Sequence, residues 1–224
     1  CANPALGLRA VRLCLRDTDL FKTQLRAILR ASALGPVRCL IPMLTSVQEI
    51  RMVHMLLEEA KEDLEAQGTA YDPDMPLGGM IEVPAAALAI TALAPYLDFI
   101  SVGTNDLLQY TLAADRVDEL VAHLYDPQHP GVVRLLRYIF REANASRIPA
   151  TVCGEVAGDP DARQHVREVR LLPGLPEGRR LVRDPASLSR PAGGSATGER
   201  CGLESISGRY RWVTALRRRN RSGA

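Results

Sequence analysis

Long apolar runs are missing from this 224-residue sequence, in which no stretch approaches the roughly 18 residues of a membrane-spanning helix. A positively charged segment followed by an apolar core, the mark of a secretory signal, does not open the sequence either. A Gly-x-Gly-x-x-Gly fingerprint is also missing, which disfavours a dinucleotide-binding fold. With 46% apolar residues the sequence still supplies a sizeable core, so it predicts a globular protein without a membrane partner.

Cysteine and histidine are few, and neither follows a metal-binding spacing. The cysteines form an odd set, which predicts free thiols in a reducing compartment, so we expect a cytoplasmic location. The residues concerned are Cys1, Cys14, Cys39, Cys153 and Cys201, together with His54, His123, His129 and His165.

Lysine is missing from residues 163–224, which contain fourteen Arg and five acidic residues, a net charge of +9. Since the whole sequence carries +2, residues 1–162 carry −7 and have the composition of an acidic enzyme. The Pro/Gly/Ser/Arg-rich remainder predicts a poorly structured tail. Its only aromatic residues are Tyr210 and Trp212, which does not favour a nucleic-acid partner. Because a GC-rich gene read in the wrong frame yields Arg, Pro, Gly and Ala, an out-of-frame or replaced tail is a further hypothesis.

Residues 1–162 alternate between helical and strand-like apolar patterns. Helices are predicted at 19–33, 46–67, 85–93, 117–124 and 132–144, with another after residue 105, and strands at 38–43, 78–84, 98–102 and 148–153. Ser46 and Glu49 have the spacing of a capping box. Such alternation indicates a parallel sheet with right-handed crossovers. A (β/α) barrel has eight strands, so four strands predict an α/β fold of about half a barrel.

Polar or reactive residues stand at the ends of these strands. Glu82 ends the second strand and Cys153 the fourth, while Asn105 and Asp106 follow the third. A barrel active site requires such groups at several strand ends. Simpler readings stay open, because Asn105-Asp106 suit a helix cap and Glu82 suits a structural ion pair. A buried cysteine is usually inert, yet Cys153 precedes a glycine and an acid, which favours proton transfer.

Three segments resemble the phosphoenolpyruvate-utilising enzymes. They are GTNDLLQYTLAADR at 103–116, NPALGLRAVR at 3–12 and CGEVAGD at 153–159. Tyr110 and the CGEVAGD segment make the sequence more similar to the Enzyme I group, the phosphoenolpyruvate-protein phosphotransferases of bacterial sugar transport, than to the dikinases and synthases. The resemblance covers residues 3–162.

The resemblance implies a partial (β/α)8 TIM-type barrel, the C-terminal domain of that family, over residues 1–162, with residues 163–224 as the tail. Family members pass a phosphoryl group from phosphoenolpyruvate to their own histidine and on to the carrier protein HPr, releasing pyruvate. The resemblance also implies Mg²⁺ as cofactor and a homodimer in the intact enzyme.

Site residues follow from the same resemblance. Glu82 and Asp106 resemble the Mg²⁺ ligands, and hard carboxylate oxygens suit that ion. Asn105 and Asp106 resemble substrate contacts of the signature. Arg9 and Arg116 resemble the arginines that bind the substrate, for which a guanidinium fork is suited. Cys153 resembles the proton donor to the enolate carbon.

Several departures leave alternatives open. None of the four histidines resembles the phosphoryl acceptor, and segments that carry two further substrate-binding arginines in the family have no counterpart in the sequence. We therefore expect a fragment that is inactive by itself. A fragment of a dikinase or synthase is one alternative. The other is a non-enzymatic remnant, in which the acidic half-barrel binds another chain and the tail binds nucleic acid.

Overall fold

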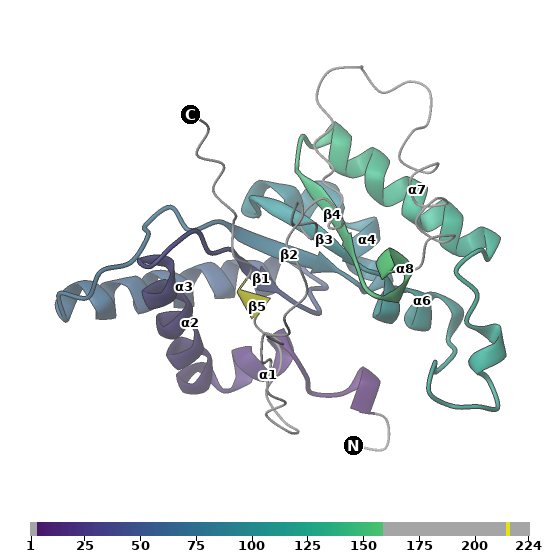
Figure 1. Ribbon diagram of the computed structural model, residues 1–224, viewed down its shortest axis with the longest axis horizontal. Coiled ribbons are helices and arrows are strands. Elements are labelled where there is room, and N and C mark those ends of the chain that lie inside the picture. The colour runs from purple at the N-terminus through teal and green to yellow at the C-terminus, as the bar shows by residue number, and fades with distance from the viewer. Residues whose placement is uncertain (1–3, 159–213, 216–224) are drawn as a thin grey trace, which may run out of the picture.

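The computed structural model describes residues 4–158 and 214–215 (Figure 1). Its centre is a parallel sheet of four strands in chain order, joined by helical crossovers. The strands are β1 (Cys39–Ile41), β2 (Leu77–Ile81), β3 (Phe99–Gly103) and β4 (Ala150–Cys153). A two-residue strand, β5 (Thr214–Ala215), pairs antiparallel with the outer side of β1. This order, with each strand beside its predecessor, is that of a segment of a (β/α) barrel and confirms the predicted fold class.

Helices connect these strands and cover the sheet (Figure 1). Helix α2 packs against α3, and α7 packs against α4 and α5. None of the helices in the described ranges has the length and hydropathy to cross a membrane. The α-helices are α1 (Val11–Arg16), α2 (Thr18–Ser32), α3 (Val47–Ala66), α4 (Pro84–Leu88), α5 (Ile90–Leu93), α6 (Thr104–Leu112), α7 (Pro130–Ala145) and α8 (Glu155–Gly158), and the 3₁₀ turns are η1 (Pro4–Leu6), η2 (Ala94–Tyr96) and η3 (Ala122–Leu124).

The strands are mostly apolar and lie in the core of the described chain. Every residue of β1 and β3 is buried. Apolar stripes of α2 and α3 join this core, each fully buried Leu or Ile side chain contributing about 1.5–3 kcal/mol. Close packing in β2 leaves no room for a side chain at Gly78, where a Cβ would lie 2.3 Å from the ring of Phe99.

Helix α3 begins with the capping box that the sequence predicts. The N–H of Glu49 donates to Oγ of Ser46 at 3.3 Å, and the N–H of Ser46 donates back to Oε2 of Glu49 at 2.9 Å. The same oxygen accepts from the N–H and the hydroxyl of Thr45, at 2.7 and 2.8 Å. One carboxylate therefore satisfies three donors where the chain leaves β1.

Two predicted helices differ from the structure. The helix expected at 117–124 is wrong apart from η3, because the carboxylates of Asp115 and Asp118 accept from the N–H groups two residues ahead, at 3.0 Å each. Such local turns compete with helical hydrogen bonds. The helix expected at 85–93 is divided into α4 and α5 at Ala89, whose φ of −102° and ψ of 15° leave the helical region.

The predicted tail lies outside the described residues, apart from the two residues of β5. The boundary at residue 162 stays a prediction.

Candidate functional site

Three parallel strands bring their carboxyl ends to one edge of the sheet. The register pairs Ile81 with Val102, and Gly103 with Cys153. Glu82 therefore follows β2 at the level where β3 passes into α6 and β4 ends. Figure 1 shows α6 and α8 at this edge. The side chains that the sequence singles out thus come from neighbouring strand ends.

Glu82 is 7% exposed, and its environment is that of a carboxyl held away from water. Its Oε1 accepts a 2.7 Å hydrogen bond from the N–H of Met43, which has a φ of 58° at the end of the first strand segment. The pKa of Glu82 is raised to about 7, chiefly by burial and also by the negative charge of Asp106, while the hydrogen bond from Met43 and the charge of Arg9 oppose the rise. A backbone N–H thus supplies a hydrogen-bond donor, which the ion-pair interpretation of Glu82 did not foresee.

Gly103 lets Glu82 approach the start of α6. A Cβ at this position would lie 2.9 Å from Oε2 of Glu82 and 3.0 Å from Sδ of Met80. The glycine of the signature is therefore required for space rather than for an unusual backbone angle.

Arg9 reaches α6 from the segment before α1. Its Nη2 lies 3.1 Å from Oδ2 of Asp106, with side-chain exposures of 19% and 13%. Its Nη1 donates to the hydroxyl of Tyr110 at 3.3 Å. Asp106 and Tyr110 are four residues apart, so they share one face of α6. Arg9 precedes α1, and its two contacts reach residues of α6 that lie about a hundred positions further along the chain.

Asn105 does not cap α6. The N-cap is Gly103, and α6 has no side-chain cap hydrogen bond. Instead, Oδ1 of Asn105 accepts from the N–H of Glu155 at 2.8 Å, and the hydroxyl of Thr104 donates to the carbonyl of Cys153 at 2.9 Å. Gly154 between them has a φ of 103°, and a Cβ there would lie 2.5 Å from Oγ1 of Thr104. The start of α6 thus holds the turn after β4.

The thiol of Cys153 lies between β3 and β4. The hydroxyl of Ser101, itself buried, donates to Sγ at 3.2 Å, and Sγ lies 3.4 Å from the carbonyl oxygen of Val102, to which it donates. Burial raises the pKa of Cys153, Ser101 opposes this, and the charge of Glu82 adds to it. The thiol is therefore protonated at neutral pH, as a proton donor must be. Sequence reasoning did not identify Ser101, whose position two residues before Gly103 gives no chemical signal.

Arg116 lies beyond the end of α6, beside the β4 turn. Its Nη1 is 3.7 Å from Oε1 of Glu155. That nitrogen is buried and has no hydrogen-bond partner within the described part of the chain. Tyr125 completes the surroundings, since its hydroxyl donates to the carbonyl of Asn105 at 3.2 Å. The turn after β4 therefore ties Arg116 to Asn105 through Glu155.

Two carboxylates, Glu82 and Asp106, are the candidate metal ligands. No group of three His, Cys, Asp or Glu side chains that could hold a metal occurs in the ranges 4–158 and 214–215. Mg²⁺ needs no such group, because it is commonly held by one or two carboxylates together with waters and substrate oxygens. The charge of Asp106 raises the pKa of Glu82, and a cation between them would remove that repulsion. The donor pair therefore fits Mg²⁺.

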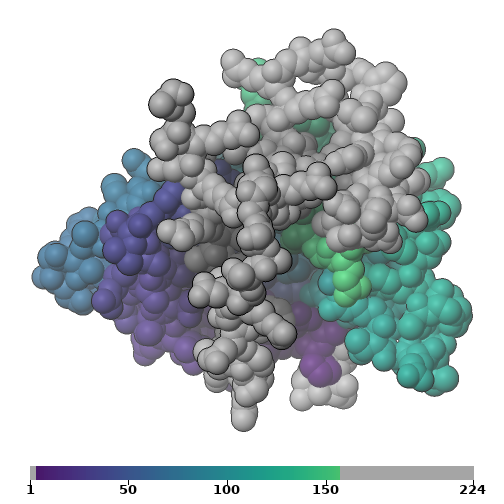
Figure 2. All heavy atoms as spheres, viewed as in Figure 1, coloured from purple at the N-terminus to yellow at the C-terminus, as the bar shows by residue number. Residues whose placement is uncertain are grey.

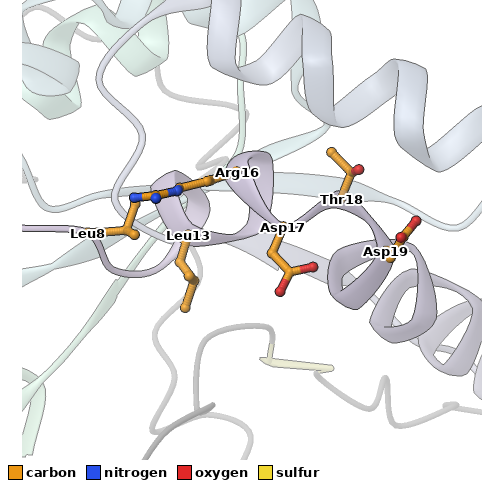
Figure 3. Close-up of a pocket in the computed structure, with 6 residues that line it drawn as sticks. All are labelled: Leu8, Leu13, Arg16, Asp17, Thr18 and Asp19. Atoms are coloured by element: carbon orange, nitrogen blue, oxygen red, sulfur yellow. The ribbon is translucent and has the colours of Figure 1, made fainter.

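A hollow at the junction of α1 and α2 contains none of these residues (Figure 3). Asp17 in its wall accepts from the N–H of Leu20 at 3.2 Å and so caps α2. This arrangement accounts for the carboxylate without a ligand. The hollow is lined by Leu8, Leu13, Arg16, Asp17, Thr18 and Asp19.

Residues 1–171 match the family described as PEP-utilising enzyme, PEP-binding domain. The chain belongs to this family. It is 52% identical over 188 residues to the phosphoenolpyruvate-protein phosphotransferase of Cupriavidus necator, covering 84% of this chain and 31% of that relative. The corresponding protein of Geobacillus stearothermophilus is 47% identical over 160 residues, covering 71% of this chain and 28% of the relative. That of Listeria monocytogenes is 45% identical over 173 residues, covering 77% and 29%.

The chain thus spans about a third of the length of these PEP-utilising relatives. Among solved structures, a citrate lyase from Burkholderia xenovorans LB400 matches 66% of this chain and 53% of its own, with a TM-score of 0.45 and 17% identity.

Proposed function

We propose that this chain is the phosphoenolpyruvate-binding catalytic domain of a phosphoenolpyruvate-protein phosphotransferase. The observation that carries the proposal is the convergence of Arg9, Glu82 and Asp106 at one sheet edge, in a member of the PEP-utilising family. The intact enzyme would transfer the phosphoryl group of phosphoenolpyruvate to its own histidine, and then to HPr during sugar uptake.

The substrate carries a phosphate and a carboxylate, both of which suit guanidinium groups. Arg9 and Arg116 are the proposed arginine contacts. The pair of Arg116 with Glu155 supports this role, because it keeps the guanidinium beside the β4 turn that Asn105 holds. Asn105 keeps two amide N–H donors for the substrate while its oxygen holds the β4 turn.

Glu82 and Asp106 are the residues that would hold Mg²⁺, an ion that supplies positive charge to the enolate and phosphate oxygens of the substrate. Asp106 also pairs with Arg9, so the carboxylate would hold the cation and orient the arginine at once. Because its pKa is raised to about 7, Glu82 is partly protonated near neutral pH, and it would lose that proton on holding the cation.

Cys153 is the proposed proton donor. When the P–O bond of phosphoenolpyruvate breaks and the phosphoryl group bonds to the histidine nitrogen, the electron pair stays on the enolate. The thiol proton then moves to C3 of the enolate, which gives pyruvate and leaves a thiolate. The raised pKa of Cys153 supports this role, since the thiol keeps its proton until the enolate forms.

The same proposal assigns HPr as the phosphoryl-accepting partner of the intact enzyme, a homodimer as its assembly, and the cytoplasm as its location. Family membership and the curated relatives support these assignments.

Isothermal titration of phosphoenolpyruvate into the 224-residue chain tests the proposal. Binding is expected with Mg²⁺ and not without it. Asp106→Asn weakens this binding by about tenfold or more, because it removes a metal ligand. The matched control is Asp63→Asn, which breaks the 2.8 Å surface pair with Arg26 and leaves binding unchanged. No binding with Mg²⁺ would overturn the substrate assignment, and equal binding without Mg²⁺ would overturn the metal assignment.

A further inference from the structure

Tyr110 joins three segments that are distant in the sequence. Its hydroxyl donates to the carbonyl of Ala5 at 2.5 Å and accepts from Nη1 of Arg9 at 3.3 Å. It also lies 3.9 Å from Sδ of Met43, whose N–H donates to Glu82. Figure 2 shows the purple start of the described chain against the green and teal surface formed by residues after 100. A hydroxyl on α6 thus contacts both the segment before α1 and the turn that follows β1.

The direction of these hydrogen bonds follows from the single donor proton of a phenol. A hydroxyl has one proton to donate, and here it goes to the Ala5 carbonyl, so the oxygen lone pairs face the guanidinium of Arg9. The phenol stays neutral, because burial and the charge of Asp106 raise the pKa of Tyr110. The contact with Arg9 is therefore a neutral acceptor that takes no charge away from the arginine.

The second contact of Arg9 lies one helical turn earlier. Nη2 donates to Oδ2 of Asp106 while Nη1 donates to the hydroxyl of Tyr110, so α6 binds both terminal nitrogens of the guanidinium. Asp106 and Tyr110 contact different terminal nitrogens of this guanidinium. With both residues, the plane of the guanidinium is set relative to α6 and to the Glu82–Asp106 pair.

We propose that Tyr110 is a positioning residue, which fixes the Arg9 guanidinium and the segment that carries it against the site. This inference rests on the proposed function for its consequence in substrate binding, and on the contacts above for the tether itself. No chemical step is assigned to the phenol.

Native-state proteolysis tests the tether without any ligand. Trypsin cleaves after Arg9 only when the segment leaves its place, because Ala10 on the other side of the bond is fully buried. Tyr110→Phe keeps the ring and removes the hydroxyl, so cleavage after Arg9 is expected to become about fivefold faster. The matched control is Tyr138→Phe on α7, which removes a hydroxyl that donates to the carbonyl of Leu88 at 3.4 Å. Equal rates in Tyr110→Phe and Tyr138→Phe would overturn the tether.

Titration of phosphoenolpyruvate with Mg²⁺ tests the consequence. Tyr110→Phe is expected to raise the Kd about three- to tenfold, the effect of one lost hydrogen bond, whereas Tyr138→Phe does not. In an Arg9→Lys background, which lacks the fork, the effect of Tyr110→Phe on the Kd is expected to disappear. The same Kd change in both backgrounds would overturn the positioning role, because Tyr110 would then act independently of Arg9.

The two measurements separate this inference from the proposed function. If the parent chain fails to bind phosphoenolpyruvate, the proposed function fails, and the trypsin comparison still decides whether Tyr110 holds Arg9. A thermal melt of each variant confirms that cleavage reports local opening, since Tyr110→Phe is expected to unfold close to the parent.

Discussion

At the residue scale, the site combines a buried carboxyl with a raised pKa, a carboxylate paired with an arginine, and a thiol kept in its neutral form. Glu82 receives one backbone donor and little water, while Asp106 is paired with Arg9. Burial and the nearby charge of Asp106 raise the pKa of Glu82, and a buried carboxyl with a raised pKa is typical of functional sites. The sequence predicts a partner for Glu82, yet a backbone N–H of Met43 cannot be anticipated from side-chain chemistry, because it depends on the left-handed backbone at that residue.

Glu82 makes stability depend on pH. Its pKa rises from 4.5 to about 7 on folding, so the folded state favours the neutral carboxyl. The resulting stability is complete below about pH 4.5 and is lost as the pH rises through 7. Between pH 5 and 8 the parent is expected to lose roughly 2.5 kcal/mol of unfolding free energy that Glu82→Gln keeps. Urea unfolding at the two pH values measures this, with Glu62→Gln on the exposed face of α3 as control. Parallel pH profiles for parent and Glu82→Gln would contradict it.

Cys153 is expected to exchange the methyl protons of pyruvate with solvent. Removal of a C3 proton is the reverse of the proposed protonation, so the same sulfur serves both directions. In deuterium oxide with Mg²⁺, Cys153→Ala lowers the exchange rate, followed by proton NMR, about a hundredfold. Cys14→Ala on α1, a half-buried thiol outside the site, keeps the parental rate. Parental exchange in Cys153→Ala would exclude the thiol as the donor.

At the element scale, the turns that leave the strands do most of the positioning. The start of α6 holds the β4 turn through Thr104 and Asn105, and the signature therefore has a structural task beside its proposed chemical one. The α3 capping box follows from local spacing and is predicted correctly. The helix expected at 117–124 fails because side chains two residues apart satisfy the backbone locally, which apolar periodicity does not register.

Glu49 is the anchor of the turn between β1 and α3. Glu49→Ala leaves the two N–H groups and the hydroxyl of Thr45 and Ser46 without their acceptor, so a loss of about 2 kcal/mol in unfolding free energy is expected. Glu49→Gln keeps an oxygen acceptor and loses less. Chemical denaturation measures both, and Glu62→Ala on the same helix is expected to stay within about 0.5 kcal/mol of the parent. Equal losses in the alanine and glutamine variants would show that the box contributes only through charge.

At the scale of the whole molecule, alternating helices and strands suffice to predict the parallel sheet and its chain order. They do not predict that the segment before α1 packs against α6. That contact joins residues about a hundred positions apart, and local patterns carry no information on it. The resemblance supplied Arg9 and Asp106 as separate site residues, and only the structure pairs them. In the sequence, Tyr110 serves only to distinguish the Enzyme I group from the dikinases and synthases, although its spacing of four from Asp106 indicates a shared helix face.

A double-mutant cycle on this long-range pair measures how much it holds the molecule together. The Arg9–Asp106 pair, with both side chains mostly buried, is expected to show a coupling of about 1–2 kcal/mol in unfolding free energy. The Arg26–Asp63 pair is more exposed, and its coupling is expected to stay near 0.5 kcal/mol or below. Similar couplings for the two pairs would show that Arg9 serves binding alone.

The separation of Arg9 from its partners on α6 also has a consequence for the order of events during synthesis. Arg9 and Asp106 are 97 residues apart. At about 5–20 residues per second, a ribosome needs roughly 5–20 s to extend the chain over that distance. The segment before α1 therefore emerges before α6, and it can dock on α6 only after β1, β2 and β3 have been synthesised. A pause in translation anywhere in between would leave Arg9 outside the ribosome without its partner Asp106.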